Sequence, residues 1–124
     1  MAFMKGARAL SGSERAILER ILTGSFRGGA RLLRQLDDVK VAGTWGVESP
    51  SVDLKVAGDA PPVDAPDGVL PVVGEVFDES GDLVGELLVW VSEGYLSALE
   101  YSWFTDEPPV ALPDVARVSV RWDG

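Results

Sequence analysis

The stretch Pro71–Phe104, PVVGEVFDESGDLVGELLVWVSEGYLSALEYSWF, holds the strongest structural pattern of the chain. Two turn sequences, ESGD and SEG, divide it into three runs rich in β-branched and aromatic residues, near 71–78, 83–92 and 95–104. Runs of this length that are joined by short polar turns are typical of consecutive antiparallel strands. The stretch therefore predicts a three-stranded antiparallel meander.

Apolar residues occupy both sets of alternating positions in this meander, and alternate side chains of a strand point to opposite faces. In the middle run the two sets are Leu87, Val89 and Val91 against Leu88 and Trp90. In the last run they are Leu99, Tyr101 and Trp103 against Leu96, Ala98 and Phe104. Two short helices cover one face at most, so the second face must be covered by loops or curvature, form a cavity, or meet a partner.

The residues before the meander predict two helices. Ser11 and Glu14 have the spacing of a capping box. Apolar residues then recur at helical spacing, at Ile17, Leu18, Ile21 and Leu22, which predicts a helix near 12–23. A second, shorter helix is expected at about 28–36, because Leu32, Leu33 and Leu36 share a face.

Alternating valines predict the remaining strands. Val39 and Val41, then Val52, Leu54 and Val56, indicate a hairpin, and Val118, Val120 and Trp122 indicate a last short strand. The expected fold is α+β, with two N-terminal helices packed on a predominantly antiparallel sheet of about six strands. We expect a single domain over 1–124, with a loose N-terminus at 1–10 and a mobile loop at 58–68, where three prolines and three aspartates gather.

The composition narrows the chemistry. The 124 residues include no cysteine and no histidine. Disulfides, thiolate chemistry and a Ser-His-Asp arrangement are therefore excluded, and catalysis would have to use carboxylates, Lys, Tyr, Ser or Thr. We expect no cofactor. The sequence has no apolar run of about 18 residues, the length that crosses a membrane, and we expect a cytoplasmic protein.

Charge is divided unevenly along the chain. Residues 1–36 hold seven basic and two acidic residues, whereas residues 37–124 hold four basic and eighteen acidic ones. The basic part offers arginines that could line phosphates, at Arg15, Arg20, Arg27, Arg31 and Arg34. The acidic remainder would repel a nucleic acid, so we expect these arginines to face solvent or to pair with the protein's own acidic sheet rim.

Two acidic groups within the meander suggest chemistry at first sight. Asp78, Glu79, Asp82 and Glu86 resemble a calcium loop, but Gly81 stands at the fourth position, where an EF-hand loop needs its glycine at the sixth. We therefore expect no metal site. Glu75, Glu86 and Glu100 fall in adjacent runs, where two carboxylates facing each other could divide acid and base roles. The alternative is that they are exposed residues that discourage edge pairing.

The segment Ser97–Asp114, SALEYSWFTDEPPVALPD, places acids beside aromatic residues. Two prolines after Glu107 hold the chain extended and without backbone donors, so Asp106 and Glu107 stand on a stiff loop next to Trp103. An aromatic anchor beside acids suits a basic protein partner. In the alternative interpretation, Trp103 closes the core and the prolines merely end the sheet.

This segment also resembles a known pattern. Leu99-Glu100, Trp103, Asp106-Glu107-Pro108-Pro109 and Pro113-Asp114 are similar to a pattern of small acidic proteins of actinobacterial type. The similarity extends loosely to the sequence ERAILERIL in the first helix. It implies a shared fold and a cytoplasmic setting, and no function. In general character the chain also resembles small acidic immunity proteins that neutralise toxins.

These observations favour a non-enzymatic acidic protein that masks a basic protein partner, an immunity-type inhibitor being one form of it. The expected binding residues are Glu100, Tyr101, Trp103, Asp106 and Glu107. The alternative is a small-ligand or hydrolytic pocket between the sheet and the first helix, using Glu100 or Glu75 with Tyr101 and Trp103. A third hypothesis is self-association of two copies through the uncovered face of the sheet.

Overall fold

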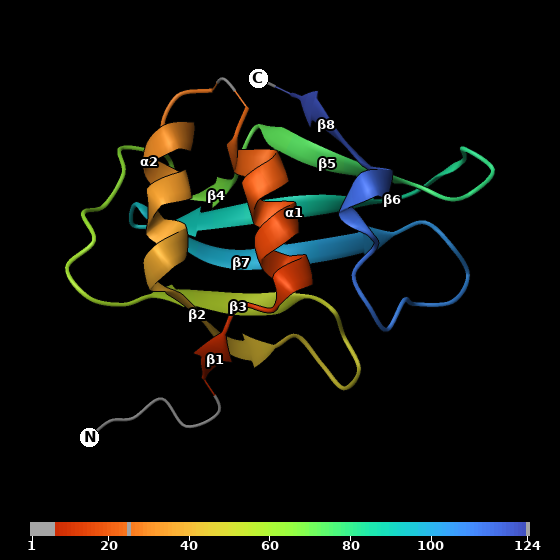
Figure 1. Cartoon of the computed structure of the whole chain (residues 1–124), viewed down its shortest axis with the longest axis horizontal. Coiled ribbons are helices and arrows are strands. Elements are labelled where there is room, and N and C mark those ends of the chain that lie inside the picture. Colours follow the sequence, from red (N-terminus) through yellow and green to blue (C-terminus); the bar gives the residue numbers. More distant parts are fainter. Residues whose placement is uncertain (1–6, 25, 124) are drawn as a thin grey trace.

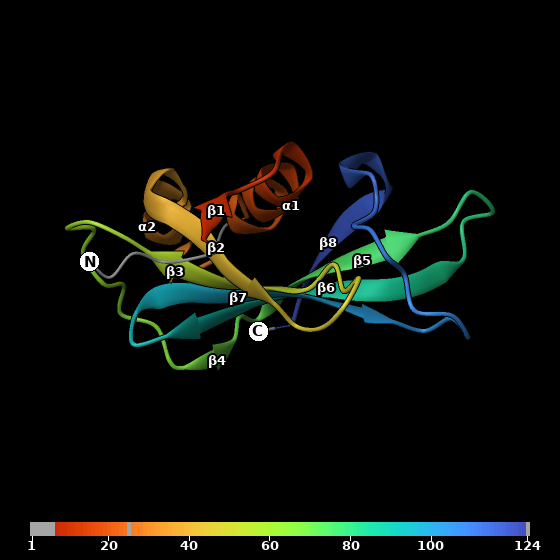
Figure 2. The ribbon, with the colours of Figure 1, turned by 90° about the horizontal axis from the view of Figure 1, so that it is seen from below.

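Two helices lie on one face of an antiparallel sheet in the computed structural model, which describes residues 7–24 and 26–123 (Figure 1). Helices α1 (Gly12–Leu22) and α2 (Gly29–Arg34) both lie on the same side of the sheet (Figure 2). The α+β class is confirmed. None of the helices in the described ranges has the length and apolar character needed to cross a membrane.

The sheet has eight strands rather than about six. They are β1 (Arg8–Ala9), β2 (Val39–Thr44), β3 (Val52–Val56), β4 (Gly68–Val69), β5 (Val72–Phe77), β6 (Leu83–Ser92), β7 (Tyr95–Trp103) and β8 (Val118–Trp122). Short 3-10 helices, η1 (Gln35–Asp38) and η2 (Val115–Arg117), complete the elements. The strands that were not expected, β1 and β4, have two residues each, which is too short to show an alternating pattern.

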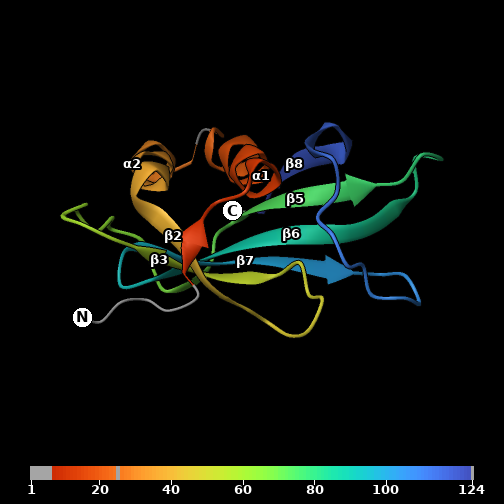
Figure 3. The same ribbon diagram turned by 60° about the horizontal axis from the view of Figure 1, so that its bottom comes forward.

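The predicted meander is the centre of the sheet. Its strands β5, β6 and β7 lie side by side, in the overall order β1-β2-β3-β7-β6-β5-β8, with β4 also beside β6. All the pairings are antiparallel. The expected hairpin β2–β3 joins the meander at β7, through the pairs Val52↔Leu99 and Asp53↔Ala98 (Figure 3).

The core lies between the helices and the strand side chains that face them (Figure 2). Ile17 and Ile21 of α1 are fully buried, as are Leu87 and Leu99 of the sheet. Gly74 marks the contact: a Cβ there would lie 3.2 Å from Cδ1 of Ile21 and 3.0 Å from Cγ1 of Val118. Because Gly74 has no side chain, α1 can approach β5 closely. Gly74 therefore marks the face of the sheet that is turned toward the helices.

The side chain of Leu96 lies on the opposite face of the sheet to the face that strict alternation predicts. Val91 pairs with Leu96, and Trp90 pairs with Ala98, so Ser97 is an extra residue in β7. This β-bulge reverses the alternation at its position. Leu96 therefore shares the buried face with Leu99, and the prediction that the two lie on opposite faces is wrong.

The loop 58–68 contains no regular structure before β4, as expected, but several hydrogen bonds attach it to the body. The amide of Val63 donates to the carbonyl of Gly94 at 2.8 Å, and the hydroxyl of Tyr95 donates to the carbonyl of Ala60 at 3.1 Å. Val63 is buried. The middle of the loop is thus part of the packed structure.

The predicted capping box begins α1. The amide of Glu14 donates to Oγ of Ser11 at 3.1 Å, and the amide of Ser11 donates to Oε1 of Glu14 at 2.8 Å. Arg8 adds a bidentate pair to the Glu14 carboxylate, with both bonds at 2.8 Å. This pair helps to hold Arg8–Ala9 beside β2. Of the stretch expected to be loose, residues 1–6 lie outside the described ranges, whereas β1 is paired.

Replacement of Glu14 by glutamine is expected to lower the free energy of unfolding at pH 7 by about 1–2 kcal/mol, because Glu14 is buried and its bonds are charge-assisted. Burial by itself raises the pKa of Glu14, but the bonds from Arg8 and Ser11 outweigh it and lower the pKa. A carboxylate with a lowered pKa stabilises the fold above its unfolded pKa of about 4.3, and this stabilisation is lost as the pH falls through the folded pKa.

Urea unfolding of wild type and Glu14→Gln between pH 3 and 7 measures this effect. The difference between them should shrink as the pH falls below about 4.3. Glu19→Gln is the control, since Glu19 and its partner Arg15 are about half exposed, and such a pair contributes less than about 0.5 kcal/mol. A difference that does not depend on pH would contradict the role of the ionised Glu14.

Candidate functional site

Three of the five predicted binding residues line one hollow of about 510 Å³. Glu100, Tyr101 and Trp103 lie on the last part of β7. The opposite wall comes from the β2–β3 connection and consists of Trp45, Ser49 and Ser51. The structure therefore joins the predicted segment to a loop that sequence reasoning did not assign to the site.

The hollow exists because β3 begins at Val52, opposite Leu99, whereas β7 continues to Trp103. Their pairing covers only Val52↔Leu99 and Asp53↔Ala98. The next amide on this edge, that of Tyr101, donates to Oγ of buried Ser51 at 2.8 Å. Within the described residues, no strand pairs with Tyr101–Trp103 on this side. The end of β7 is thus an open edge inside an eight-stranded sheet, and open edges are sites where other chains can bind.

Indole and carboxylate groups are paired around this hollow. Nε1 of Trp45 donates to Oδ1 of Asp53 at 3.0 Å. Nε1 of Trp90 donates to Oε1 of Glu100 at 3.0 Å. Each bond uses one carboxylate oxygen, orients an indole ring, and leaves the second oxygen of the carboxylate for another donor. Glu100 is therefore held in place at the hollow and keeps an oxygen for a ligand.

Trp103 does not close the core. Its side chain is 44% exposed, whereas Tyr101 is only 7% exposed and Leu99 is fully buried. Burial raises the pKa of the Tyr101 hydroxyl. The β7 strand thus passes from the core to the surface over these residues, and the interpretation in which Trp103 fills the core is wrong.

The other two predicted residues, Asp106 and Glu107, do not line the hollow. They are exposed in the loop that follows β7, and among the described residues neither one forms an ion pair. The loop leaves the sheet at the same end as the β2–β3 connection (Figure 1). Asp106 and Glu107 therefore contribute negative charge near the open edge rather than contacts within it.

The predicted carboxylate pair exists, but an arginine occupies it. Glu75 and Glu86 are cross-strand neighbours in β5 and β6. Nη1 of Arg121 donates to both carboxylates at 2.9 Å, and Nε of Arg121 donates to Asp123 at 2.7 Å. The hydrogen bond to Asp123 has the largest effect in raising the pKa of Arg121. The same bond lowers the pKa of Asp123. The guanidinium fills the place that a substrate would need between the carboxylates.

The position of Glu75 contradicts the alternative prediction of a ligand pocket between the sheet and the first helix. Gly74 faces α1, so its neighbour Glu75 points to the opposite face of the sheet. Glu100 is likewise one residue from the helix-facing Leu99. In the described structure Glu75 and Glu100 therefore lie on the face away from α1, where neither lines a pocket between the sheet and this helix.

The acidic turn and the basic helices form internal contacts. Oδ1 of Asp78 accepts from the amides of Ser80 and Asp82, both at 2.9 Å, as expected of a hairpin turn. No group of three or more metal-ligating side chains occurs in residues 7–24 and 26–123. Most of the arginines bond within the protein: Arg15 contacts Glu19 and Asp37, Arg27 contacts Asp64, and Arg20 donates to the carbonyl of Val118.

No protein-family model, curated protein or solved structure matches this chain. The resemblance of the Leu99–Asp114 segment to small acidic proteins stays an expectation. The geometry of the hollow and the charges around it are therefore the features of this chain that bear on its function.

Proposed function

We propose that this protein is a non-enzymatic acidic binding protein that masks a basic surface of a protein partner in the cytoplasm. An immunity-type inhibitor is one form of this function. The hollow at the open edge of β7 carries the proposal, because it brings Glu100, Tyr101 and Trp103 together with Trp45.

A lysine or arginine side chain of the partner suits this hollow chemically. Trp45 and Trp103 are 46% and 44% exposed and supply aromatic faces, which attract cations by cation–π interaction. The second carboxylate oxygen of Glu100 supplies a counter-ion. The Tyr101 amide donates to Ser51, but no strand pairs with the rest of the Tyr101–Trp103 edge in the described residues, and its backbone groups are offered to the extended chain that would carry this cation.

The charge of the surrounding surface supports the same partner. The chain has a net charge of -9, and the Asp106–Glu107 loop adds exposed carboxylates at the end of β7. Exposed charges of this kind accelerate the association of an oppositely charged partner, and salt screens the effect. Steering charges change mainly the association rate, whereas buried anchors change mainly the dissociation rate.

The test begins with capture of partners from a lysate at low salt, elution with a salt gradient, and purification of the protein that is released. Its association and dissociation rates are then measured by surface plasmon resonance. Trp103→Ala should raise the dissociation rate at least tenfold, since loss of an aromatic anchor costs about 2 kcal/mol or more. Asp106→Lys with Glu107→Lys should lower the association rate several-fold, and the effect should fall as salt rises.

A matched control changes the same charge elsewhere. Asp59→Lys with Glu93→Lys reverses two exposed carboxylates that form no ion pair among the described residues and that lie in connections at the other end of the sheet (Figure 1), so it should change the association rate less. The proposal would be contradicted by a partner whose binding rates do not change with salt, with the lysine substitutions at 106 and 107, or with Trp103→Ala. Elution of the protein alone at a volume that depends on its concentration would instead support self-association.

A further inference from the structure

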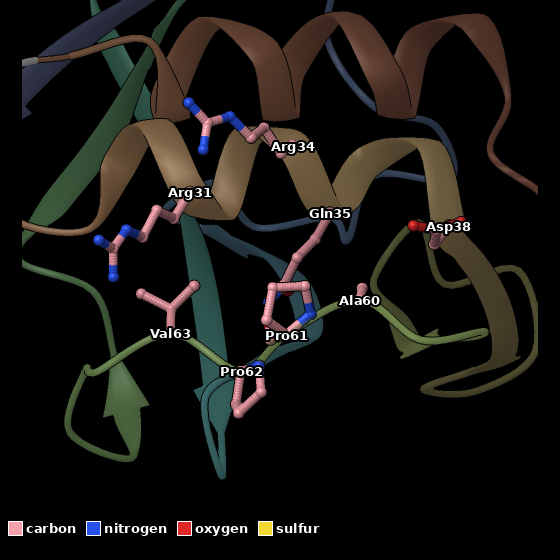
Figure 4. Close-up of a pocket in the computed structure, with 8 residues that line it drawn as sticks. All are labelled: Arg31, Arg34, Gln35, Asp38, Ala60, Pro61, Pro62 and Val63. Atoms are coloured by element: carbon pink, nitrogen blue, oxygen red, sulfur yellow. The ribbon is translucent and has the colours of Figure 1, made fainter.

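A second hollow lies on the helix side of the molecule, between α2–η1 and the loop 60–63 (Figure 4). Its volume of about 430 Å³ is within the usual range for small-molecule sites, about 300–1,000 Å³. The helical wall provides Arg31, Arg34, Gln35 and Asp38, and the loop wall provides residues 60–63. We call this hollow the arginine cleft.

The two arginines of the cleft have no polar partner in the described part of the chain. Six of the eight arginines within the described ranges contact a carboxylate or donate to a backbone carbonyl. Arg31 and Arg34 do neither, although the chain contains 20 Asp and Glu residues. Two arginines without a polar partner among the described residues thus line one cleft of an acidic protein, and their guanidinium groups point in different directions (Figure 4).

Hydrogen bonds hold the loop wall of the cleft in place. The side chain of Gln35 is 2% exposed, and its Nε2 donates to the carbonyls of Pro61 at 3.3 Å and Gly94 at 3.0 Å. Oε1 of Gln35 accepts from the amide of Leu96 at 3.0 Å. With the bonds of Val63 and Ala60 described above, the wall is attached along its whole length. A pre-formed wall reduces the entropy that ligand binding would cost.

The chemistry of the walls defines a class of ligand. Guanidinium groups bind phosphate oxygens through paired N–H donors. Pro61, Pro62 and Val63 present an apolar surface on the facing wall, where the Arg31 side chain lies beside Val63 (Figure 4). Proline-rich extended segments pack well against aromatic rings. Asp38 lies at the far end of the cleft from Arg31 and would repel an anion there.

We propose that the arginine cleft binds a small aromatic phosphomonoester. Arg31 and Arg34 bind its phosphate, and the ring packs against Pro61, Pro62 and Val63. The site shares no residue with the hollow at β7, so it goes beyond the proposed function, and either proposal can fail without the other.

Isothermal titration of the full chain with phenyl phosphate tests the site, with amide chemical shifts to locate it. Saturable binding with shifts at Arg31, Arg34 and Val63 is expected. The double variant Arg31→Gln/Arg34→Gln should bind at least tenfold more weakly. Asp38→Asn should bind two- to threefold more tightly, since it removes the repulsion at the far end of the cleft.

The control Lys40→Gln/Lys55→Gln also removes two positive charges. These lysines are exposed cross-strand neighbours, one residue away from the core-facing Val39, Val41 and Leu54, so they lie on the face without helices. This variant should bind phenyl phosphate within twofold of wild type. Lack of saturable binding, or equal affinity of the arginine double variant, would overturn the site. Equal affinity for inorganic phosphate would overturn the role of the apolar wall.

Discussion

Replacement of Gly85 by alanine is expected to destabilise the protein by about 3 kcal/mol, at the upper end of the cost of overpacking. A Cβ at Gly85 would lie 2.6 Å from Cε1 of Tyr101 and 2.7 Å from the carbonyl oxygen of Ser102. The tyrosine ring can move, but the carbonyl belongs to β7, which pairs with β6 at this point. Relief of the contact therefore requires the two strands to shift apart.

The same shift would alter the proposed binding site, since Tyr101 and Trp103 lie on the displaced part of β7. Urea unfolding measures the destabilisation. Gly43→Ala is a matched control in β2, because a Cβ at that position has no atom within 4 Å. The control should be unchanged or more stable by about 0.4–1 kcal/mol, since alanine restricts the unfolded chain. Equal stabilities for the two variants would refute the packing argument.

Replacement of Gln35 by leucine is expected to lower the free energy of unfolding by about 2–4 kcal/mol, because buried polar groups would lose their partners. Leucine has a comparable volume but no polar atom. The amide of Leu96 and the carbonyl of Pro61 would lose the Gln35 side chain, whereas the carbonyl of Gly94 would keep the bond from Val63. The substitution would therefore weaken the contact that joins η1, the loop 60–63 and the start of β7.

Two measurements separate this effect from a general loss of stability. Urea unfolding gives the free energy, and hydrogen exchange should show reduced protection of the Leu96 and Val63 amides beyond that of the sheet centre. Arg34→Leu, one residue away and exposed, should change stability by less than about 0.5 kcal/mol. Unchanged protection of both amides in Gln35→Leu would show that the glutamine does not hold the loop.

Local patterns predicted most of the elements because their causes are local. The capping box at Ser11 and Glu14 involves residues three apart, and the meander strands carry their turns between them. The β-bulge at Ser97 escaped prediction because an inserted residue is visible only against its partner strand. For the same reason, Arg8 could not be assigned to Glu14, and the two-residue strands β1 and β4 gave no pattern.

Some residues of the candidate site could likewise be predicted from the sequence, and others could not. Glu100, Tyr101 and Trp103 could be selected from their own segment, since aromatic residues beside acids are unusual there. Trp45 and Ser51 could not, because only the pairing of β3 with β7 brings the β2–β3 connection to this edge. The reach of Arg121 across β5 to Glu75 and Glu86 likewise depends on strand order.

The sequence by itself determined the helices, the meander, the α+β class and the separation of charge, because helical periodicity, strand alternation, turn residues and charge are properties of neighbouring residues. Only the tertiary structure decided where β3 begins along β7, which carboxylates Arg121 contacts, and which arginines have no polar partner among the described residues. These features arise from contacts between residues far apart in the chain, and such contacts depend on strand order and register, which short-range patterns do not encode.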